Sequence, residues 1–491
     1  MKISELTKGM NVDIVGFSNI EISGISFDSR KVSKGNIFAA LHGSKDEGKK
    51  YIKDAIFRGA IAILTDDNAI IEKDATYIIS NNVSEALGVI SSRFYNEPSK
   101  KMKVFAITGT NGKTTITYLI EKIFKDANIN LGVIGTILYR FGDSKIPASN
   151  TTPSSPELHE LLANMRSNGA DGVVMEASSH SLVQNRISGC DLDVAIFTNL
   201  TRDHLDYHKT MEEYEKAKSL LFNKFLKNSS KDKKYSIINI DDASGRNLVK
   251  EAPGILMTYG IKTKADFRAS DIIINKDKTE FIINTAKDKI KIETKLIGKH
   301  NIYNILAAFI CAYCQNINID SIVTSIKEFE SVPGRFESIN IGQPFTVIVD
   351  YAHTPDALGN LIMAAKTIKH RKIIMVFGCG GDRDRTKRPL MGEISARMSD
   401  YSIITSDNPR SEKPERIALD IEVGFQRIKC KNYEVIVDRT SAIEKAISIC
   451  EKDDILLIAG KGHEDYQVIG DIKIPYNDKD VVISYLGDRV R

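Results

Sequence analysis

The chain has 491 residues, and 68 Lys and Arg residues against 64 Asp and Glu residues leave a formal net charge of +4. So small a surplus argues against binding to nucleic acid or to an anionic membrane surface. The length exceeds what one hydrophobic core serves and predicts about three domains.

Residues 1–98 alternate short apolar runs with turns, and we expect them to form a small N-terminal α/β domain. The polar segment 97–101 follows these runs and marks the end of the domain. The predicted strands are Ile22–Phe27, Ile37–Ala40, Ala60–Leu64 and Thr76–Ile79.

A strand, a glycine-rich turn and a helix are predicted next. The apolar run Val104–Ile107 leads into Gly109–Thr115, and Ile116–Phe124 has the apolar spacing of a helix. This order predicts a cradle for nucleotide phosphates, in which backbone N–H groups meet phosphate oxygens. Lys113 would add a positive charge, and the Thr114 hydroxyl would reach Mg²⁺. The turn is shorter than the common P-loop, so an ordinary Gly-Asn turn before a surface helix is a second interpretation.

Strands and helices keep alternating after this motif, which predicts a mostly parallel sheet covered by helices. The segment Lys262–Lys291 holds short alternating runs, which predict a small antiparallel subsheet. A domain boundary is predicted near Val332–Arg335, so the central P-loop-type domain covers residues 99–332. Its further buried strands are predicted at Val173–Glu176, Val194–Asn199 and Ser236–Ile240.

The same alternation restarts beyond Arg335 and predicts a C-terminal Rossmann-like, doubly wound domain over 333–491. Its predicted strands are Phe345–Val349, Ile373–Phe377, Ser402–Thr405, Tyr433–Val437 and Ile455–Ile458.

The six cysteines follow no metal-binding pattern. Cys311 and Cys314 sit in an apolar stretch, so one face of a buried helix is favoured over a metal or redox pair. The N-terminus lacks a charged segment followed by an apolar one, and no apolar run approaches the ~20 residues that span a bilayer. We therefore expect a cytoplasmic protein without a membrane span.

Polar clusters follow the predicted strands, where ligands bind in such sheets. Glu176 ends one strand and could hold Mg²⁺, although a solvated carboxylate is an equal alternative. The segment Thr198–His208 gathers two histidines and two aspartates, which favours a metal or phosphate site over a structural turn.

Similar clusters follow the strands of the last domain. They are Asp350–Pro355, Gly378–Pro389, Asp407–Arg410 and Ala459–Glu464, and Arg335 follows a Pro-Gly turn. Arginine binds carboxylate bidentately and glutamate binds ammonium, so the last three clusters suit a zwitterionic amino acid. Arg335 could balance phosphate charge, and Asp350 could accept a hydrogen bond from a ribose hydroxyl. Turn residues with surface ion pairs are the alternative for Arg335 and Asp350.

Taken together, these motifs resemble the Mur ligases over essentially the whole chain. The matching segments, in order, are Asp28–Arg30, Thr108–Thr115, Asn150–Pro153, Glu176–Arg186, Asp203–His208, Gly298–Asn301, Pro333–Glu337, Asp350–Pro355, Asp407–Arg410 and Gly460–Glu464. The short phosphate turn, unusual for a general P-loop, is typical of this family.

The resemblance implies an ATP site, a Mg²⁺ site and a catalytic set. ATP would contact Gly109, Thr110, Asn111, Gly112, Lys113, Thr114, Thr115, Asn301, Arg335 and Asp350. Mg²⁺ would be held by Thr114, Glu176, His204 and Lys218, and the catalytic residues would be Lys113, Glu176, His204 and Lys218. The family carries a carbamylated lysine in the segment that matches Tyr214–Lys218, which points to Lys218, with Lys216 close enough to leave the register open.

The resemblance also implies two further substrates. UDP-MurNAc-L-Ala-D-Glu would contact Ser29, Ser44, Lys45, Asp46, Thr151, Thr152, Ser178, Gln184 and Arg186. The incoming amino acid would contact Arg388, Asp407, Asn408, Pro409, Arg410, Gly460 and Glu464.

The reaction implied is ATP-dependent amide-bond formation in peptidoglycan precursor synthesis, through an acyl phosphate and with ADP as a product. Arg410 favours meso-diaminopimelate, whose second carboxylate it would pair, over L-lysine. A folylpolyglutamate synthetase and a non-catalytic UDP-muropeptide-binding protein are further alternatives, and we expect a monomer.

Overall fold

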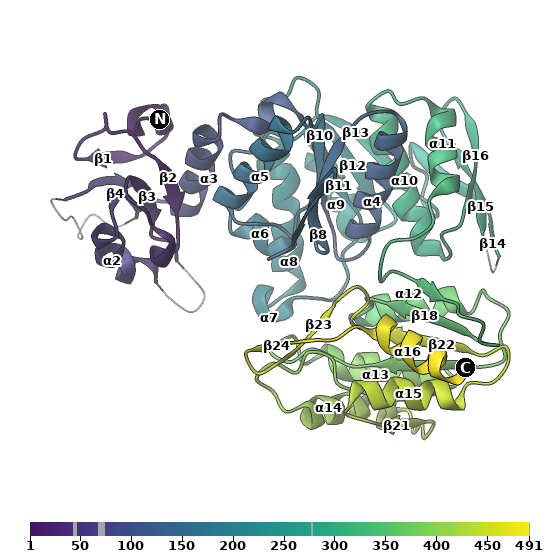
Figure 1. Ribbon diagram of the computed structural model, residues 1–491. Helices are drawn as coiled ribbons and strands as arrows, with labels where there is room; N and C mark the ends of the chain where they lie inside the picture. The colour runs from purple at the N-terminus through teal and green to yellow at the C-terminus, as the bar shows by residue number, and fades with distance from the viewer. Residues whose placement is uncertain (43–46, 67–73, 276–277, 491) are drawn as a thin grey trace.

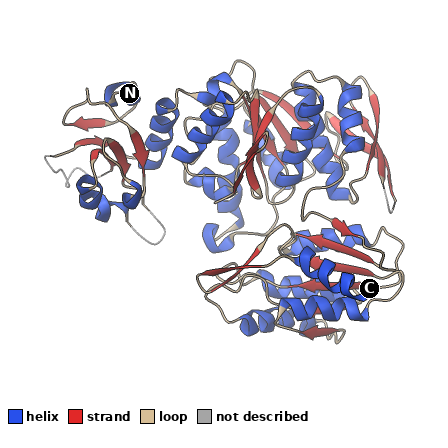
Figure 2. Cartoon of the chain, viewed as in Figure 1, coloured by secondary structure: helices blue, strands red, loops and turns tan. Residues whose placement is uncertain are grey.

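The computed structural model describes residues 1–42, 47–66, 74–275 and 278–490, and it forms three α/β domains (Figure 1). Each domain is built around a sheet of its own. The central domain lies between the other two along the chain, and helices cover its sheet on both faces (Figure 2). The expected fold class is confirmed, whereas the residues at which the domains begin and end remain a prediction.

The N-terminal sheet has the order β1-β5-β4-β3-β2, in which only the β1–β5 pair is antiparallel among the described strands. The predicted strands all form, although the first shortens to Gly24–Ser26. The elements are β1 (Asp13–Val15), β2 (Gly24–Ser26), β3 (Asn36–Ala39), β4 (Ala60–Thr65), β5 (Thr76–Ile79), α1 (Ile3–Leu6), α2 (Ile52–Phe57), α3 (Val83–Phe94) and the 3₁₀ turns η1 (Ser29–Lys31) and η2 (Gly48–Tyr51).

The central sheet has the order β16-β15-β14-β13-β12-β11-β6-β10-β7-β8-β9. Strands β14 to β7 of this order pair in parallel, and antiparallel strands extend both edges. The strands are β6 (Lys103–Thr108), β7 (Leu131–Ile134), β8 (Leu138–Phe141), β9 (Ser144–Pro147), β10 (Gly172–Glu176), β11 (Val194–Phe197), β12 (Tyr235–Asn239), β13 (Ile255–Gly260), β14 (Phe267–Ile274), β15 (Thr279–Asn284) and β16 (Lys289–Thr294).

Alternate side chains of β6 enter two hydrophobic cores, one on each face of the sheet. Phe105 and Ile107 join a core with α4 and α10, whereas Val104 and Ala106 join a core with α5. The helical elements of this domain are η3 (Pro98–Lys101), α4 (Lys113–Asp126), α5 (Ser155–Ser167), α6 (Ser179–Val183), α7 (Leu205–His208), α8 (Met211–Leu220), the π-helical turn η4 (Leu221–Leu226), α9 (Ala243–Leu248), η5 (Val249–Glu251), α10 (Lys299–Cys314) and α11 (Ile319–Glu328).

The C-terminal sheet has the order β17-β18-β22-β19-β20-β21, parallel from β18 to β21, and β23 and β24 form a separate hairpin. Helices α12, α13 and α14 pack on one face, and α15 and α16 pack on the other. The elements are β17 (Glu337–Ile339), β18 (Thr346–Asp350), β19 (Ile373–Phe377), β20 (Tyr401–Ile404), β21 (Tyr433–Val435), β22 (Ile455–Ala459), β23 (Tyr466–Ile469), β24 (Ile472–Pro475), α12 (Pro355–Ala365), α13 (Lys387–Met398), α14 (Pro414–Arg427), α15 (Arg439–Ile449) and α16 (Asp478–Val490).

Two predictions about helices and spans can be compared with the fold. Cys311 and Cys314 lie on the buried helix α10, as expected. Within the described residues, none of the helices is both long enough and apolar enough to cross a bilayer.

Candidate active site

The glycine-rich turn lies between β6 and α4, and neighbouring segments of the chain pack closely against it. Gly109 and Gly112 adopt φ values of +144° and +91°, which favour glycine. A Cβ atom at Gly109 would lie 1.8 Å from Thr198 Oγ1, and one at Gly112 would lie 2.3 Å from Asn304 Oδ1. The turn therefore requires both glycines, and it presents the N-terminus of α4 as an anion site.

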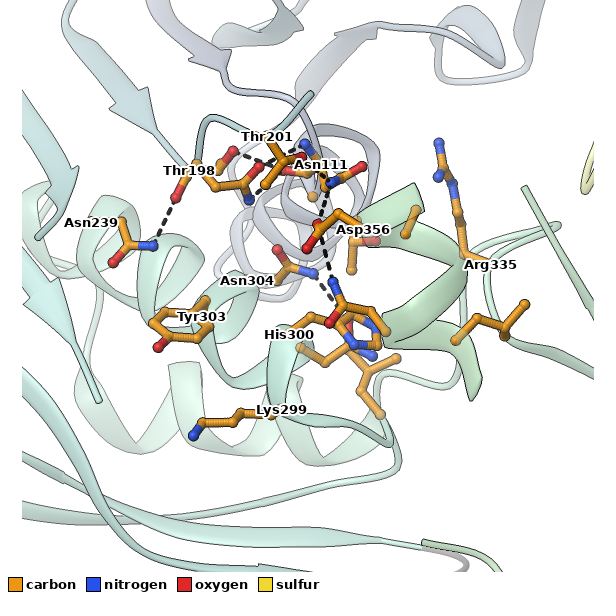
Figure 3. A pocket seen from close by; sticks show the side chains of 18 of the residues that line it. Asn111, Thr198, Thr201, Asn239, Lys299, His300, Tyr303, Asn304, Arg335 and Asp356 are labelled. Carbon is orange, nitrogen blue, oxygen red and sulfur yellow. Dashed lines mark hydrogen bonds between the residues drawn. The ribbon is translucent and has the colours of Figure 1, made fainter. Parts of the chain in front are cut away.

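A cavity of about 410 Å³ opens beside this turn (Figure 3). Asn111 and Gly112 line one side, and Asn301 lines another from α10. Arg335 and Asp350 reach the same cavity from the C-terminal domain. The structure thus brings together these members of the expected ATP set.

Glu176 ends β10 with a buried carboxylate, 1% exposed, beside the phosphate turn. Thr114 Oγ1 donates to its Oε1 at 3.0 Å, and the backbone N–H and hydroxyl of Thr136 donate to its two oxygens, also at 3.0 Å. These hydrogen-bond partners are neutral, and the charge of Lys113 also acts on this carboxylate. A carboxylate and a hydroxyl are oxygen ligands of the kind that Mg²⁺ prefers, so the residues fit this ion.

His204 stands at the start of α7 in the left-handed region, with φ +54°. Its ring lies 5.0 Å from that of His180 and 6.1 Å from that of Tyr214, between centroids. Burial, together with the nearby charges of His180, Lys218 and Lys113, lowers the pKa of His204 to about 3. The ring is therefore neutral near pH 7, which is the form that binds a metal. Within the described residues, no group of three or more His, Cys, Asp or Glu side chains is clustered for a metal.

Lys218 is buried on α8 and points at the phosphate turn. Its Nζ donates to the Gly109 carbonyl at 2.8 Å and lies 4.5 Å from the centre of the Tyr214 ring. Lys113 Nζ donates to the same carbonyl, also at 2.8 Å. Burial, and then the charge of Lys113, hold the pKa of Lys218 well below its usual value.

Side chains of the C-terminal domain reach the loops of the central one. Arg335 Nη2 donates to Thr114 Oγ1 at 3.3 Å, and Asn111 Nδ2 donates to Asp356 Oδ2 at 2.9 Å. Figure 3 shows Asp356 next to Asn111, with this hydrogen bond drawn between them. The loop before α7 adds Arg202, whose Nη2 donates to Thr386 Oγ1 at 2.6 Å. The phosphate turn is thus shared between two domains.

The residues expected at the dipeptide form one connected group. Thr152 Oγ1 donates to the Glu176 carbonyl at 2.8 Å and accepts from the Ser178 amide at 3.1 Å. Arg186 Nη1 donates to the Thr152 carbonyl at 2.9 Å, and Arg186 Nε donates to Gln184 Oε1 at 2.8 Å.

Thr151 joins this group, because its hydroxyl lies 3.2 Å from that of Thr136. Ser29 lies apart from it, buried at the start of η1 in the N-terminal domain. Ser44, Lys45 and Asp46 lie outside the described residues.

Arg388, expected at the amino acid, is paired through its Nη atoms with carboxylates of the protein. It is 0% exposed, its two Nη atoms donate to Glu412 at 2.9 and 2.7 Å, and Nη1 also donates to Asp420 at 2.9 Å. Its Nε has no hydrogen-bond partner among the described residues. A substrate carboxylate that approached the Nη atoms would compete with two carboxylates already there.

The other residues expected at the amino acid surround the ends of β20 and β22. Arg410 Nη1 donates to the Gly381 carbonyl at 2.8 Å, next to the turn that contains Pro409. Asn408 Nδ2 donates to Glu464 Oε2 at 2.9 Å. A Cβ atom at Gly460 would lie 3.2 Å from Asp407 Oδ2, so the segments that contain Asp407 and Gly460 converge.

Several residues of the site were not found from the sequence. Tyr303, Asn304 and Asp356 line the cavity, and Thr136 holds Glu176. Asp241, which follows β12, accepts from the Tyr303 hydroxyl at 2.8 Å, and its place after a strand was an available signal. Tyr303, Asn304 and Asp356 lie on helices and Thr136 lies in a turn, and none of these four residues belongs to a recognisable sequence motif.

Comparisons with known proteins agree with this geometry. Residues 21–95 match the model of the Mur ligase family catalytic domain, residues 107–312 that of the Mur ligase middle domain, and residues 334–462 that of the Mur ligase glutamate ligase domain. The fold and site thus define an ATP-dependent, ADP-forming ligase, and the chain belongs to the Mur ligase family.

Its relatives include UDP-N-acetylmuramoyl-L-alanyl-D-glutamate--2,6-diaminopimelate ligases. That of Caldanaerobacter subterraneus subsp. tengcongensis is 42% identical, over 99% of each chain, and that of Clostridioides difficile is 43% identical, over 98% of each chain. A solved structure with the same title is 31% identical, with a TM-score of 0.71 over 100% of this chain and 99% of the other. The enzyme interpretation is confirmed over that of a non-catalytic binding protein.

Proposed function

We propose that the chain joins meso-diaminopimelate to the D-Glu γ-carboxylate of UDP-MurNAc-L-Ala-D-Glu, with ATP converted to ADP and phosphate. The observation that carries this proposal is that the charge of Arg410 interacts with the carboxylates of both Asp407 and Glu464 at one end of the C-terminal sheet. A guanidinium and two carboxylates match a substrate that carries both carboxylate and ammonium groups.

ATP lies in the cavity beside the phosphate turn in this proposal. The backbone amides of Gly109–Thr115 hold the phosphates, and Asn301, Arg335 and Asp350 line the remainder. Thr114, Glu176, His204 and Lys218 hold Mg²⁺, which when bound neutralises charge on the transferring phosphoryl group.

The γ-carboxylate attacks the γ-phosphorus of ATP, which forms an acyl phosphate and releases ADP. Lys113 places its positive charge next to the phosphates, as its contact with the Gly109 carbonyl supports. The amine of the amino acid then attacks the acyl carbon, phosphate leaves with the bonding pair, and the amine loses a proton. The domains contribute by holding the reacting groups together, which lowers the entropic cost of the encounter.

Lys218 is the residue that we assign to carbamylation. Carbamylation requires a neutral amine, and burial beside Lys113 favours that form of Lys218. Lys216, the alternative, is exposed on the same helix. The product is an anion that suits a metal site.

The dipeptide substrate spans the N-terminal and central domains in this proposal, from Ser29 to the group around Thr152 and Arg186. The boundaries 98/99 and 332/333 separate the three binding regions. We also propose that the protein is a cytoplasmic monomer, since ATP and the UDP-linked precursor are cytoplasmic substrates.

The amino acid is the part of this proposal that one experiment tests directly. Phosphate release is measured with ATP, Mg²⁺ and UDP-MurNAc-L-Ala-D-Glu, with meso-diaminopimelate or L-lysine supplied in parallel. We expect release with diaminopimelate only, because L-lysine leaves Arg410 without a carboxylate. Release with L-lysine only would reassign the pocket, and no release with either would refute the proposed reaction.

A further inference from the structure

A buried lysine lies beneath the residues proposed for the amino acid. Lys461, in the turn after β22, is 0% exposed. Its Nζ donates to Glu464 Oε2 at 2.9 Å and to Asn408 Oδ1 at 3.2 Å, and it lies 3.6 Å from Asp407 Oδ1. A buried ammonium is tolerated only when such partners surround it.

The carboxylates around Lys461 are not fully satisfied. The ammonium faces the two carboxylates of Asp407 and Glu464, and the charge of Arg410 also acts on both of them. The nearby guanidinium of Arg439 is matched separately, because its Nε and Nη2 each donate to Asp478 at 2.7 Å. Asp407 Oδ1 is buried and has no hydrogen-bond partner among the described residues. The cluster therefore keeps one buried carboxylate oxygen without a hydrogen-bond donor, which an ammonium group of the substrate would supply.

Lys461 also fixes the geometry of this cluster. Asn408 Nδ2 donates to the same Glu464 oxygen that Lys461 contacts, at 2.9 Å. Asn408 Oδ1, the other Lys461 partner, also accepts from the Val468 amide of β23 at 2.9 Å. Burial and the charge of Asp407 raise the pKa of Glu464, and Lys461 opposes that shift.

We propose that Lys461 is a positioning residue that holds the carboxylates of Asp407 and Glu464 in the orientation that receives an ammonium group of the incoming amino acid. It acts through these two carboxylates and touches no reacting atom. The inference rests on the proposed function, since it needs an amino-acid substrate at this site.

The test compares Lys461→Met with Lys479→Met in the full chain. Lys479 is a surface lysine paired with Glu337 at 2.7 Å, and it serves as the matched control. ADP release is followed with ATP and UDP-MurNAc-L-Ala-D-Glu saturating and meso-diaminopimelate varied. We expect the KM for diaminopimelate to rise at least tenfold in Lys461→Met, on the order of 1.4 kcal/mol, with kcat and the KM for ATP within about threefold. The control should match the wild type.

A double-mutant cycle separates positioning from general support of the fold. If Lys461 acts through Glu464, Lys461→Met should change the KM much less in a Glu464→Gln background than in the wild type. Lys461→Gln keeps a hydrogen-bond donor but loses the charge, and it should raise the KM for diaminopimelate as Lys461→Met does. If Lys461→Met fails to fold, Lys461→Gln takes its place in the cycle.

An unchanged KM for diaminopimelate in the folded variant would overturn the proposal. Additive effects in the cycle, or an equal rise in the KM for ATP, would also overturn it and leave only a structural role. Failure of the wild type to release ADP with diaminopimelate would instead refute the proposed function, so the two failures are distinguishable.

Discussion

Arg335 of the C-terminal domain donates to Thr114 Oγ1 of the central domain at 3.3 Å, and the same hydroxyl donates to Glu176 at 3.0 Å. The guanidinium also lies 4.6 Å from the centre of the Tyr351 ring, which holds it in place. The hydroxyl proposed to bind Mg²⁺ is therefore in contact with both domains. A shift of one domain relative to the other would therefore change the contacts of this hydroxyl at the proposed phosphate site.

Replacing Arg335 should impair catalysis more than folding. Arg335→Ala removes a positive charge that we propose acts on the ATP phosphates, and we expect kcat/KM for ATP to fall by about 10² to 10³. Steady-state kinetics with a thermal melt of each variant checks this. Arg397→Ala, which loses a surface pair with Glu393, is the control, and a loss of similar size there would contradict the assignment.

Carbamylation of Lys218 is open to direct detection. Intact-protein mass spectrometry at mildly alkaline pH, with isotope-labelled bicarbonate, should find one added CO₂ in the wild type and none in Lys218→Arg. Lys216→Arg should keep the adduct because Lys216 is exposed. An adduct that disappears only in Lys216→Arg would move the modification to that residue.

Gly112→Ala should weaken ATP binding. The added Cβ meets Asn304 Oδ1 at 2.3 Å, and φ of +91° strains any residue but glycine, so the turn must shift. We expect the dissociation constant for ATP, measured by calorimetry, to rise at least about tenfold. Gly359→Ala on α12, where the nearest atom is 3.8 Å away, should bind ATP as the wild type does.

The contacts of Arg202 should influence the amino-acid step. Arg202 Nε lies 3.7 Å from the buried carboxylate of Asp384, in the loop that precedes α13. Arg202→Glu replaces this attraction with repulsion, and we expect the KM for the amino acid to rise about tenfold as the domains separate. Lys233→Glu lies in an exposed loop and serves as the control, so it should leave the KM for the amino acid unchanged. If Arg202→Glu has the same KM as this control, Arg202 does not couple the two domains.

The Arg388–Glu412 pair predicts a pH dependence of stability. Hydrogen bonding to Arg388 lowers the pKa of Glu412 from 4.5 to about 2. A depressed pKa stabilises the fold fully above the unfolded value of about 4.5, and this contribution is lost as pH falls toward 2. The free energy of unfolding of Glu412→Gln should thus lie below that of the wild type near neutrality, and the gap should close below pH 4.5. Denaturant titrations across this range check it, and a gap independent of pH would contradict the pairing.

Much of the central and C-terminal architecture was predictable, because buried parallel strands are continuous apolar runs. Ile373–Phe377 forms a strand of the C-terminal domain with the predicted ends, and Thr76–Ile79 does the same in the N-terminal domain. The strands at the edges were missed for the opposite reason. Strand β9 (Ser144–Pro147) is exposed throughout, and such a segment carries no apolar pattern.

Some residues of the candidate site were also predictable from the sequence, and others were not. The segment Gly109–Thr115 was identifiable because phosphate binding needs glycines and a lysine in adjacent positions of one chain segment. Tyr303 and Asp356 enter the same cavity from α10 and α12, and neither belongs to a local pattern. Their roles depend on how helices pack.

The sequence by itself determined the strand and helix alternation, the phosphate turn and the family, since these depend on local spacing and composition. Only the tertiary structure decided that Arg388 is committed to Glu412 and Asp420, that Lys461 lies buried between two carboxylates, and that Arg335 meets Thr114. Most of these relationships join residues tens to hundreds of positions apart, and burial and charge pairing among them arise only when the chain is folded.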